Sequence, residues 1–191
     1  MVKGFFNRIW VRRFLRQGRQ SGNIEFIRQR ASQFSGSNTE TIGQILGFVK
    51  KMGEGKPGAR NEMSVDARRR ANVEHILRRN EIGGCGDAAV IFAQLARAKG
   101  IPVRLVDAVR KGYDGRGDFR GHVFADVFIN NNWITVEPVA GRVIGKGYNR
   151  IRKDGTIISY IPFAKGLDFS SMGTTTLRAI RRKSSKFLQP G

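Results

Sequence analysis

The stretch GGCGDAAVIFAQLARAKGIP, residues 83–102, joins a glycine-rich loop to an expected helix and contains the only cysteine of the chain. Apolar residues recur at helical spacing from Cys85 to about Lys99, and Gly100 and Pro102 end the helix. The thiol would therefore lie at the first helical turn, where unpaired backbone N–H groups and the helix dipole favour the thiolate. A free cysteine is also commonly just a small buried side chain. The stretch thus leaves two interpretations, a structural cysteine or a nucleophile.

The pattern of apolar residues changes after this helix. Upstream, helical spacing predicts one helix from Thr39 to about Met52 and another from Ser64 to about Arg79. Downstream, β-branched and aromatic residues typical of strands fill IPVRLVDAV (101–109), HVFADVFI (122–129), WITVEPV (133–139) and TIISYIPF (156–163). Helices followed by an antiparallel sheet indicate an α+β fold, with the N-terminal helices packed on the sheet.

A hairpin is expected between the second and third of these strands. Asn130 and Asn131 tolerate the positive φ of a two-residue turn. With such a turn, the pairing places His122 and Glu137 as diagonal neighbours on one face of the sheet. A three-residue turn would move Glu137 to the other face. The predicted proximity of these two side chains therefore depends on the turn.

A thiolate nucleophile needs a base within hydrogen-bond reach, and the base needs an orienting partner. The chain has two histidines. His75 lies within an expected helix, where a partly buried, hydrogen-bonded side chain is the simpler interpretation. His122 opens a strand directly after a glycine-rich loop. Cys85, His122 and Glu137 could then supply thiol, imidazole and carboxylate, whereas a zinc site of Cys85, His122 and His75 lacks a recognisable ligand spacing.

These segments resemble the transglutaminase-like cysteine peptidase superfamily. The resemblance rests on GGCGDAAVIFAQLARAKGIPVRLV and GHVFADVFINNNWITVEP, and it spans roughly residues 64–140. Its elements are a Gly-Cys pair that opens a helix, a strand that starts at the histidine and a tryptophan-containing strand that ends in acid-Pro. The resemblance implies a papain-like core in which Cys85 is the nucleophile, His122 the base and acid, and Glu137 the residue that orients the imidazole.

The sequence departs from the family pattern in three respects. Glu137 stands where the family usually has aspartate. No tryptophan lies between Trp10 and Trp133, although animal transglutaminases use an upstream tryptophan at the oxyanion. The Cys85 N–H could supply one oxyanion donor, and Asn61, Asn80 or Gln44 are candidates for the second. The acidic clusters of calcium-dependent members are also missing, so we expect no calcium, no other metal and no cofactor, and hydrolysis rather than cross-linking.

The chain has a net charge of +20, and much of that charge lies at its two ends. Residues 1–30 hold eight cations and one acid, and residues 176–191 hold five cations and no acid. Basic ends favour a polyanion such as nucleic acid, although solvated tails would give only non-specific attraction. The residues expected to contact an anionic partner are Arg8, Arg12, Arg13, Arg16, Arg19, Arg178, Arg181, Arg182 and Lys183. We expect a basic aromatic N-terminal extension (1–36), a transglutaminase-like core (37–170) and a basic C-terminal tail (171–191).

Composition also bears on location. No run approaches the roughly 18 apolar residues of a membrane span. The segment MVKGFFNRIWVRRFLRQGR has arginines where a secretory signal peptide has its apolar region. A single cysteine excludes a disulfide framework and favours a reducing compartment. We expect the protein in the cytoplasm, or incorporated in a virion or another nucleoprotein particle.

Two functions follow as hypotheses. The leading one is a thiol-dependent amide or peptide hydrolase that acts on a protein or peptide substrate through an acyl-enzyme and is held on a polyanion or a large assembly by its basic ends. The alternative is a catalytically weak or inactive scaffold of the same fold, which serves as a structural, nucleic-acid-associated component of a virion or other nucleoprotein particle. Reactivity of the Cys85 thiol separates them, because a scaffold needs no thiolate.

Overall fold

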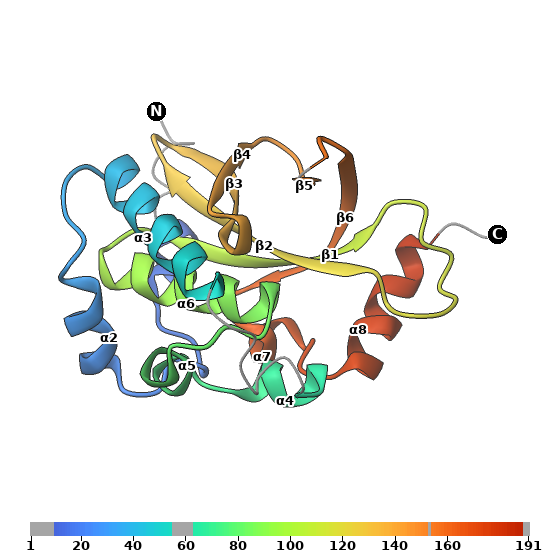
Figure 1. Cartoon of the computed structure of the whole chain (residues 1–191), viewed down its shortest axis with the longest axis horizontal. Helices are drawn as coiled ribbons and strands as arrows, with labels where there is room; N and C mark the ends of the chain where they lie inside the picture. Colours follow the sequence, from blue (N-terminus) through green and yellow to red (C-terminus); the bar gives the residue numbers. More distant parts are fainter. Residues whose placement is uncertain (1–9, 55–62, 153, 189–191) are drawn as a thin grey trace.

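A six-stranded antiparallel sheet with the order β4-β3-β2-β1-β6-β5 forms one layer of the protein (Figure 1). The structure is a computed structural model, and it describes residues 10–54, 63–152 and 154–188. The strands are β1 (Val103–Arg110), β2 (Gly121–Ile129), β3 (Asn132–Glu137), β4 (Arg142–Gly145), β5 (Asn149–Ile151) and β6 (Ile157–Gly166). The α-helices are α2 (Ile24–Ala31), α3 (Asn38–Gly53), α4 (Val65–Arg70), α5 (Val73–Arg79), α6 (Cys85–Ala98), α7 (Phe169–Met172) and α8 (Leu177–Ser184). Short 3-10 helices are η1 (Arg13–Leu15), η3 (Pro138–Ala140) and η4 (Ser185–Phe187).

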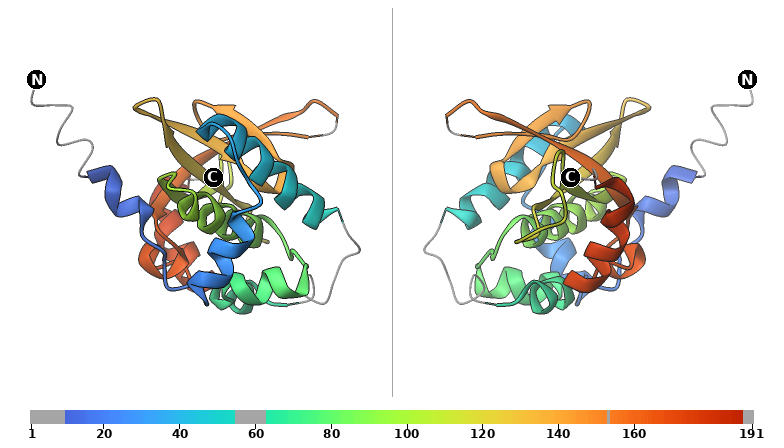
Figure 2. Two further views of the ribbon diagram at one scale, coloured as in Figure 1. Left: turned by 90° about the vertical axis from the view of Figure 1, so that its left-hand side faces the viewer. Right: turned by 90° about the vertical axis from the view of Figure 1, so that its right-hand side faces the viewer.

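Helix α6 is the centre of the hydrophobic core. It packs on β1 and β2, and α2, α3 and α5 pack around it, so that helices and sheet form two layers (Figure 2). Every residue from Ala88 to Ala96 is buried, which explains the nearly continuous apolar sequence of this helix. The same core cluster includes Ile27 from α2 and Met172 from α7. Residues of both expected extensions therefore contribute to the core, and the expected α+β class is confirmed.

The hairpin turn has the predicted length. Asn130 and Asn131 have φ values of +49° and +62°, and Ile129 pairs with Asn132. Both central residues of a type I′ turn require positive φ, which asparagine adopts more readily than most residues. The turn fixes which residues of β2 and β3 share a face.

The helix expected from Ser64 to about Arg79 is instead two helices. The Asn72 carboxamide oxygen accepts a hydrogen bond from the His75 N–H (2.8 Å) and thereby caps α5, after α4 has ended at Arg70. A side-chain cap of this kind competes with a continuous helix. Strands β4 and β5 and the helices α2, α7 and α8 were not predicted.

No helix among the described residues is both long enough and apolar enough to cross a membrane.

Candidate active site

Cys85 is the first residue of α6, and the loop before it is closely packed. Gly84 has φ +151°, a backbone conformation that residues other than glycine rarely adopt. The Asp87 carboxylate accepts a hydrogen bond from the Gly83 N–H at 2.8 Å, which fixes the entry of the chain into the helix. The free thiol of Cys85 is half-buried at this helix start. Its position beside the helix N-terminus favours the thiolate, as the sequence predicts.

His122 and Glu137 meet at the same face of the sheet. His122 Nε2 lies 3.0 Å from Glu137 Oε1, and the two side chains are 4% and 0% exposed. Arg150 of β5 brings its Nε within 3.3 Å of the same carboxylate oxygen. The imidazole also packs edge-on against Phe124 and lies against Tyr160. The hydrogen bond to Nε2 leaves Nδ1 for a second partner.

That second partner is the Cys85 thiol. Burial raises the pKa of Cys85, but the nearby His122 imidazolium and its hydrogen bond to the sulfur lower it more, to about 7. Burial lowers the pKa of His122, but the Cys85 thiolate and the Glu137 carboxylate raise it more, to about 9. Between these two values the thiolate and the imidazolium exist together as an ion pair.

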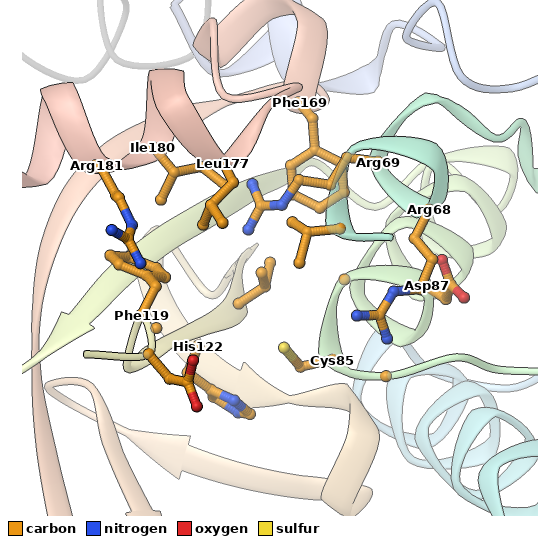
Figure 3. A pocket seen from close by; sticks show the side chains of 16 residues that line it. Arg68, Arg69, Cys85, Asp87, Phe119, His122, Phe169, Leu177, Ile180 and Arg181 are labelled. Carbon is orange, nitrogen blue, oxygen red and sulfur yellow. The ribbon is translucent and has the colours of Figure 1, made fainter. Parts of the chain in front are cut away.

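The thiol faces a cavity of about 380 Å³ (Figure 3). Helix α4, the start of α6, the β1–β2 loop (residues 111–120), the start of β2, and helices α7 and α8 form its walls. Its apolar lining includes Phe119, Phe169, Leu177 and Ile180. A hollow of this kind, with a thiol and an imidazole on one wall, has room for the acyl group of a small substrate.

Three arginines line the cavity, and two of them were not among the predicted site residues. Arg68 donates a hydrogen bond to the Gly83 carbonyl oxygen, just before Cys85. Arg69 is buried and pairs with both oxygens of Asp107, at 2.5 and 2.8 Å, while its guanidinium lies over the Phe169 ring. Arg69 also lowers the pKa of Cys85, although less than His122 does.

One sequence signal could have revealed Arg69. Asp107 is an acid in the middle of the apolar strand segment VRLVDAV, and a buried carboxylate requires a charged or hydrogen-bonding partner. The choice of Arg69 among the arginines of α4 could not be made without the fold, because 38 positions separate it from Asp107.

The proposed second oxyanion donors do not all reach the cavity. Gln44 exchanges hydrogen bonds with the backbone of Ser35 on an exposed surface. Asn80 caps the end of α5 in a left-handed conformation and is exposed. Neither residue lines the cavity, so neither candidate supplies the second oxyanion donor in this structure. Asn61 lies outside the described residues. His75 is exposed on α5, and no group of three or more metal-ligating side chains occurs within the described ranges.

The basic residues expected to bind a polyanion form two separate groups. Arg8 lies outside the described residues, and Arg12, Arg13, Arg16 and Arg19 are exposed. Arg13 stacks on Trp10 and Phe14, which contact Trp133 beside the β2–β3 turn. Arg178, Arg181 and Arg182 are exposed on α8, whereas Lys183 is partly buried and donates to the Met172 carbonyl oxygen.

Arg181 donates a hydrogen bond to the Gly117 carbonyl oxygen (3.0 Å), in the loop before the first residue of β2. Strand β2 runs from this loop to the turn beside Trp133. Its nine residues, at about 3.3 Å each, therefore separate the group around Arg13 from the group on α8.

Comparison with known proteins bears on the fold of the chain. The family model described as the transglutaminase-like superfamily matches residues 29–138. A crystal structure of a protein from Cytophaga hutchinsonii, proposed to be a cysteine protease, is similar to the chain with a TM-score of 0.57 and 15% identity. The similarity covers 86% of this chain and 49% of that one, so the chain spans about half the length of that protein. No curated protein matches the chain.

Proposed function

The chain belongs to the transglutaminase-like superfamily, and on that premise we propose that it is a thiol-dependent amide or peptide hydrolase with Cys85, His122 and Glu137 as its catalytic residues. One observation carries the proposal: the thiol, the imidazole and the carboxylate form a continuous chain of hydrogen bonds at the wall of a cavity. An ordered thiol–imidazole–carboxylate arrangement is what nucleophilic catalysis requires.

In the proposed reaction the Cys85 sulfur attacks the amide carbonyl carbon and forms a tetrahedral intermediate. His122 then gives its proton to the leaving amine nitrogen as the carbon–nitrogen bond breaks, which leaves a thioester on Cys85. The neutral imidazole next takes a proton from water while the water oxygen attacks the thioester. The carbon–sulfur bond breaks, the acid product leaves, and Cys85 returns as the thiolate beside protonated His122.

Glu137 supports these steps by holding the imidazole. Glutamate is one methylene longer than the aspartate usual in the family, yet its Oε1 lies 3.0 Å from His122 Nε2. The carboxylate can therefore fix the ring orientation and favour the imidazolium in spite of the substitution. First-turn backbone N–H groups of α6, including that of Cys85, are available to stabilise the oxyanion.

A test of the proposal uses the single cysteine. The protein is incubated with a panel of peptide amides, and intact mass spectrometry follows both the released amine and the acyl adduct, which can form as a thioester only on Cys85. We expect cleavage that is lost in Cys85→Ala and strongly reduced in His122→Ala, and retained in the matched control His75→Ala. Amide cleavage that persists in Cys85→Ala would refute the proposed nucleophile.

The basic groups support a second part of the proposal, attachment to a polyanion or a large assembly in the cytoplasm or in a nucleoprotein particle. The net charge of +20 is the observation behind it. The same charge favours a second candidate function, a structural component of a virion or other nucleoprotein particle that retains the fold without catalysis. An unreactive Cys85 thiol together with tight nucleic-acid binding would favour this candidate over the hydrolase.

A further inference from the structure

We propose that helix α8, the 3-10 helix η4 and the β1–β2 loop form one nucleic-acid-binding surface at the mouth of the candidate active-site cavity. This inference rests on the polyanion-binding part of the proposed function and is independent of amide hydrolysis. It adds a segment far from both chain ends to the expected contacts, and it places the bound nucleic acid next to Cys85.

The loop and the C-terminal segment are joined by direct contacts. Arg181 of α8 donates to the Gly117 carbonyl oxygen at 3.0 Å. Farther along, Leu188 packs so closely on Gly115 that a Cβ at that glycine would lie 2.9 Å from Leu188 Cδ1. Gly115 also has φ +89°, which favours glycine. Residues from these two segments therefore present a joint surface, which we call the basic face.

The basic face carries nine cations and two acids. The cations are Arg110 at the end of β1, Lys111, Arg116 and Arg120 of the loop, and Arg178, Arg181, Arg182, Lys183 and Lys186 of the C-terminal segment. The acids are Asp114 and Asp118. Within the described part of the chain, none of the nine cations has an ion-pair partner. Unpaired cations at this density attract a polyanion.

Part of the basic face is concave. Arg110, Lys111, Arg116 and Arg120 line a hollow of about 480 Å³ beside the loop. Asp114 lies in the same hollow, where its carboxylate accepts a hydrogen bond from the Arg116 N–H and so holds the turn of the loop. Four cations around a hollow are suited to the phosphate groups of a nucleic-acid backbone.

Two features favour nucleic acid over an anionic membrane. Six of the nine cations are arginines, whose planar guanidinium binds phosphate oxygens through two parallel hydrogen bonds. An interfacial helix also needs a free apolar side to enter the lipid. On α8, Ile180 is fully buried and Leu177 lines the cavity, so its apolar side is already occupied. The side of α8 that faces solvent carries Arg178 and Arg182 instead.

The basic face adjoins the cavity because they share residues. Arg181 belongs to the face and also lines the cavity, next to Leu177 and across from Cys85 (Figure 3). A phosphate backbone bound by Arg181 and its neighbours would lie across the cavity entrance. Bound nucleic acid should therefore slow the access of reagents to the Cys85 thiol.

The first experiment measures binding of a short mixed-sequence DNA duplex over a range of salt concentrations. Two variants remove two charges each from the basic face, Arg116→Gln/Arg120→Gln and Arg178→Gln/Arg182→Gln. The control Lys51→Gln/Arg79→Gln removes two exposed cations from α3 and α5. All three variants have the same net charge, so a difference between them reports position.

Each phosphate contact contributes about 0.9 to the slope of log K against log salt, so losing two should reduce the slope by about 1.8. Relative to a common affinity at ~1 M salt, this is roughly 30-fold weaker binding at ~0.15 M. We expect this change in both face variants and near-wild-type binding in the control. Equal weakening in all three would overturn the proposal, as would binding to phosphatidylserine-containing vesicles without binding to the duplex.

The second experiment measures alkylation of Cys85 with and without saturating duplex. We expect several-fold slower alkylation of the wild type with duplex, and no such protection in Arg178→Gln/Arg182→Gln at the same duplex concentration. Duplex binding that leaves the alkylation rate unchanged would overturn the placement at the cavity mouth. Neither experiment requires amide cleavage, so failure of the proposed hydrolase and failure of this inference give different results.

Discussion

Replacing His122 with alanine should change the reactivity of the Cys85 thiol in a way that can be calculated from the site. In the wild type the His122 imidazolium outweighs burial and brings the pKa of Cys85 from its ordinary value of about 9 to about 7. Without the imidazolium, burial would be opposed only by the smaller effects of the Val123 backbone hydrogen bond and of Arg69, so the pKa should return toward its ordinary value. The expected shift is up to about two units, or roughly 3 kcal/mol.

This shift determines the expected rates. At pH 6 a thiol with a pKa of 7 is about 9% thiolate, and one with a pKa of 9 is about 0.1% thiolate, a ratio of roughly 100. A thiolate of lower pKa is also a weaker nucleophile. With a Brønsted coefficient of about 0.5, a pKa lower by two units reduces the intrinsic rate constant of the thiolate about tenfold. The net expectation is a wild-type rate up to about tenfold higher at pH 6, together with a rate profile whose midpoint lies up to about two units lower.

The assay follows the reaction of the Cys85 thiol with a neutral pyridyl disulfide across the pH range. All of the measured product comes from Cys85, because the chain has no other cysteine. His75→Ala is the matched control, since this second histidine is exposed on α5. The reasoning would be refuted if His122→Ala left the midpoint of the rate profile in place. It would equally be refuted if His75→Ala moved the midpoint as far.

Three further predictions concern activity and stability. The rate of amide hydrolysis should rise through pH about 7 as Cys85 loses its proton, and fall through pH about 9 as His122 loses the proton that the leaving amine needs. A plot of kcat/KM against pH should show both the rise and the fall. Arg69→Met should lower the free energy of unfolding by about 3–5 kcal/mol in denaturant titration because it leaves buried Asp107 unpaired, whereas the double variant Arg69→Met/Asp107→Leu should lose less. Asn131→Val should cost about 1–2 kcal/mol at φ +62°, and Asn131→Gly should be tolerated.

The parts of the fold that could be predicted from the sequence are those with local causes. Helix α6 is encoded by apolar spacing and ends at the predicted glycine and proline, and the length of the Asn130-Asn131 turn follows from the conformational preference of asparagine. That turn sets the register of the hairpin, so the approach of His122 to Glu137 was predictable without any long-range information.

The parts that could not be predicted depend on contacts between distant segments. The arginines of α4 suggest a solvated face, but Arg69 is buried because Asp107 of β1 lies beneath it. Helix α8 appears as a basic tail in the sequence, and only the tertiary structure brings Leu177 and Ile180 to the wall of the cavity. The boundary between α4 and α5 has a local cause, the cap by the Asn72 side chain, but the helical spacing of apolar residues on both sides of Asn72 conceals it in the sequence.

Helix α8 forms one wall of the cavity, and it is synthesised after all the other walls. The Leu177 N–H donates to the Asp66 carboxylate at 2.7 Å, so α8 is tied to a helix synthesised 111 residues earlier. Synthesis proceeds from the N-terminus, and the segments with Cys85, His122 and Glu137 emerge before α8 does. A nascent chain can thus assemble its thiol, imidazole and carboxylate while one side of the hollow is still missing. The enclosure around the sulfur is complete only after Leu177, Ile180 and Arg181 have been synthesised and α8 has packed against α4.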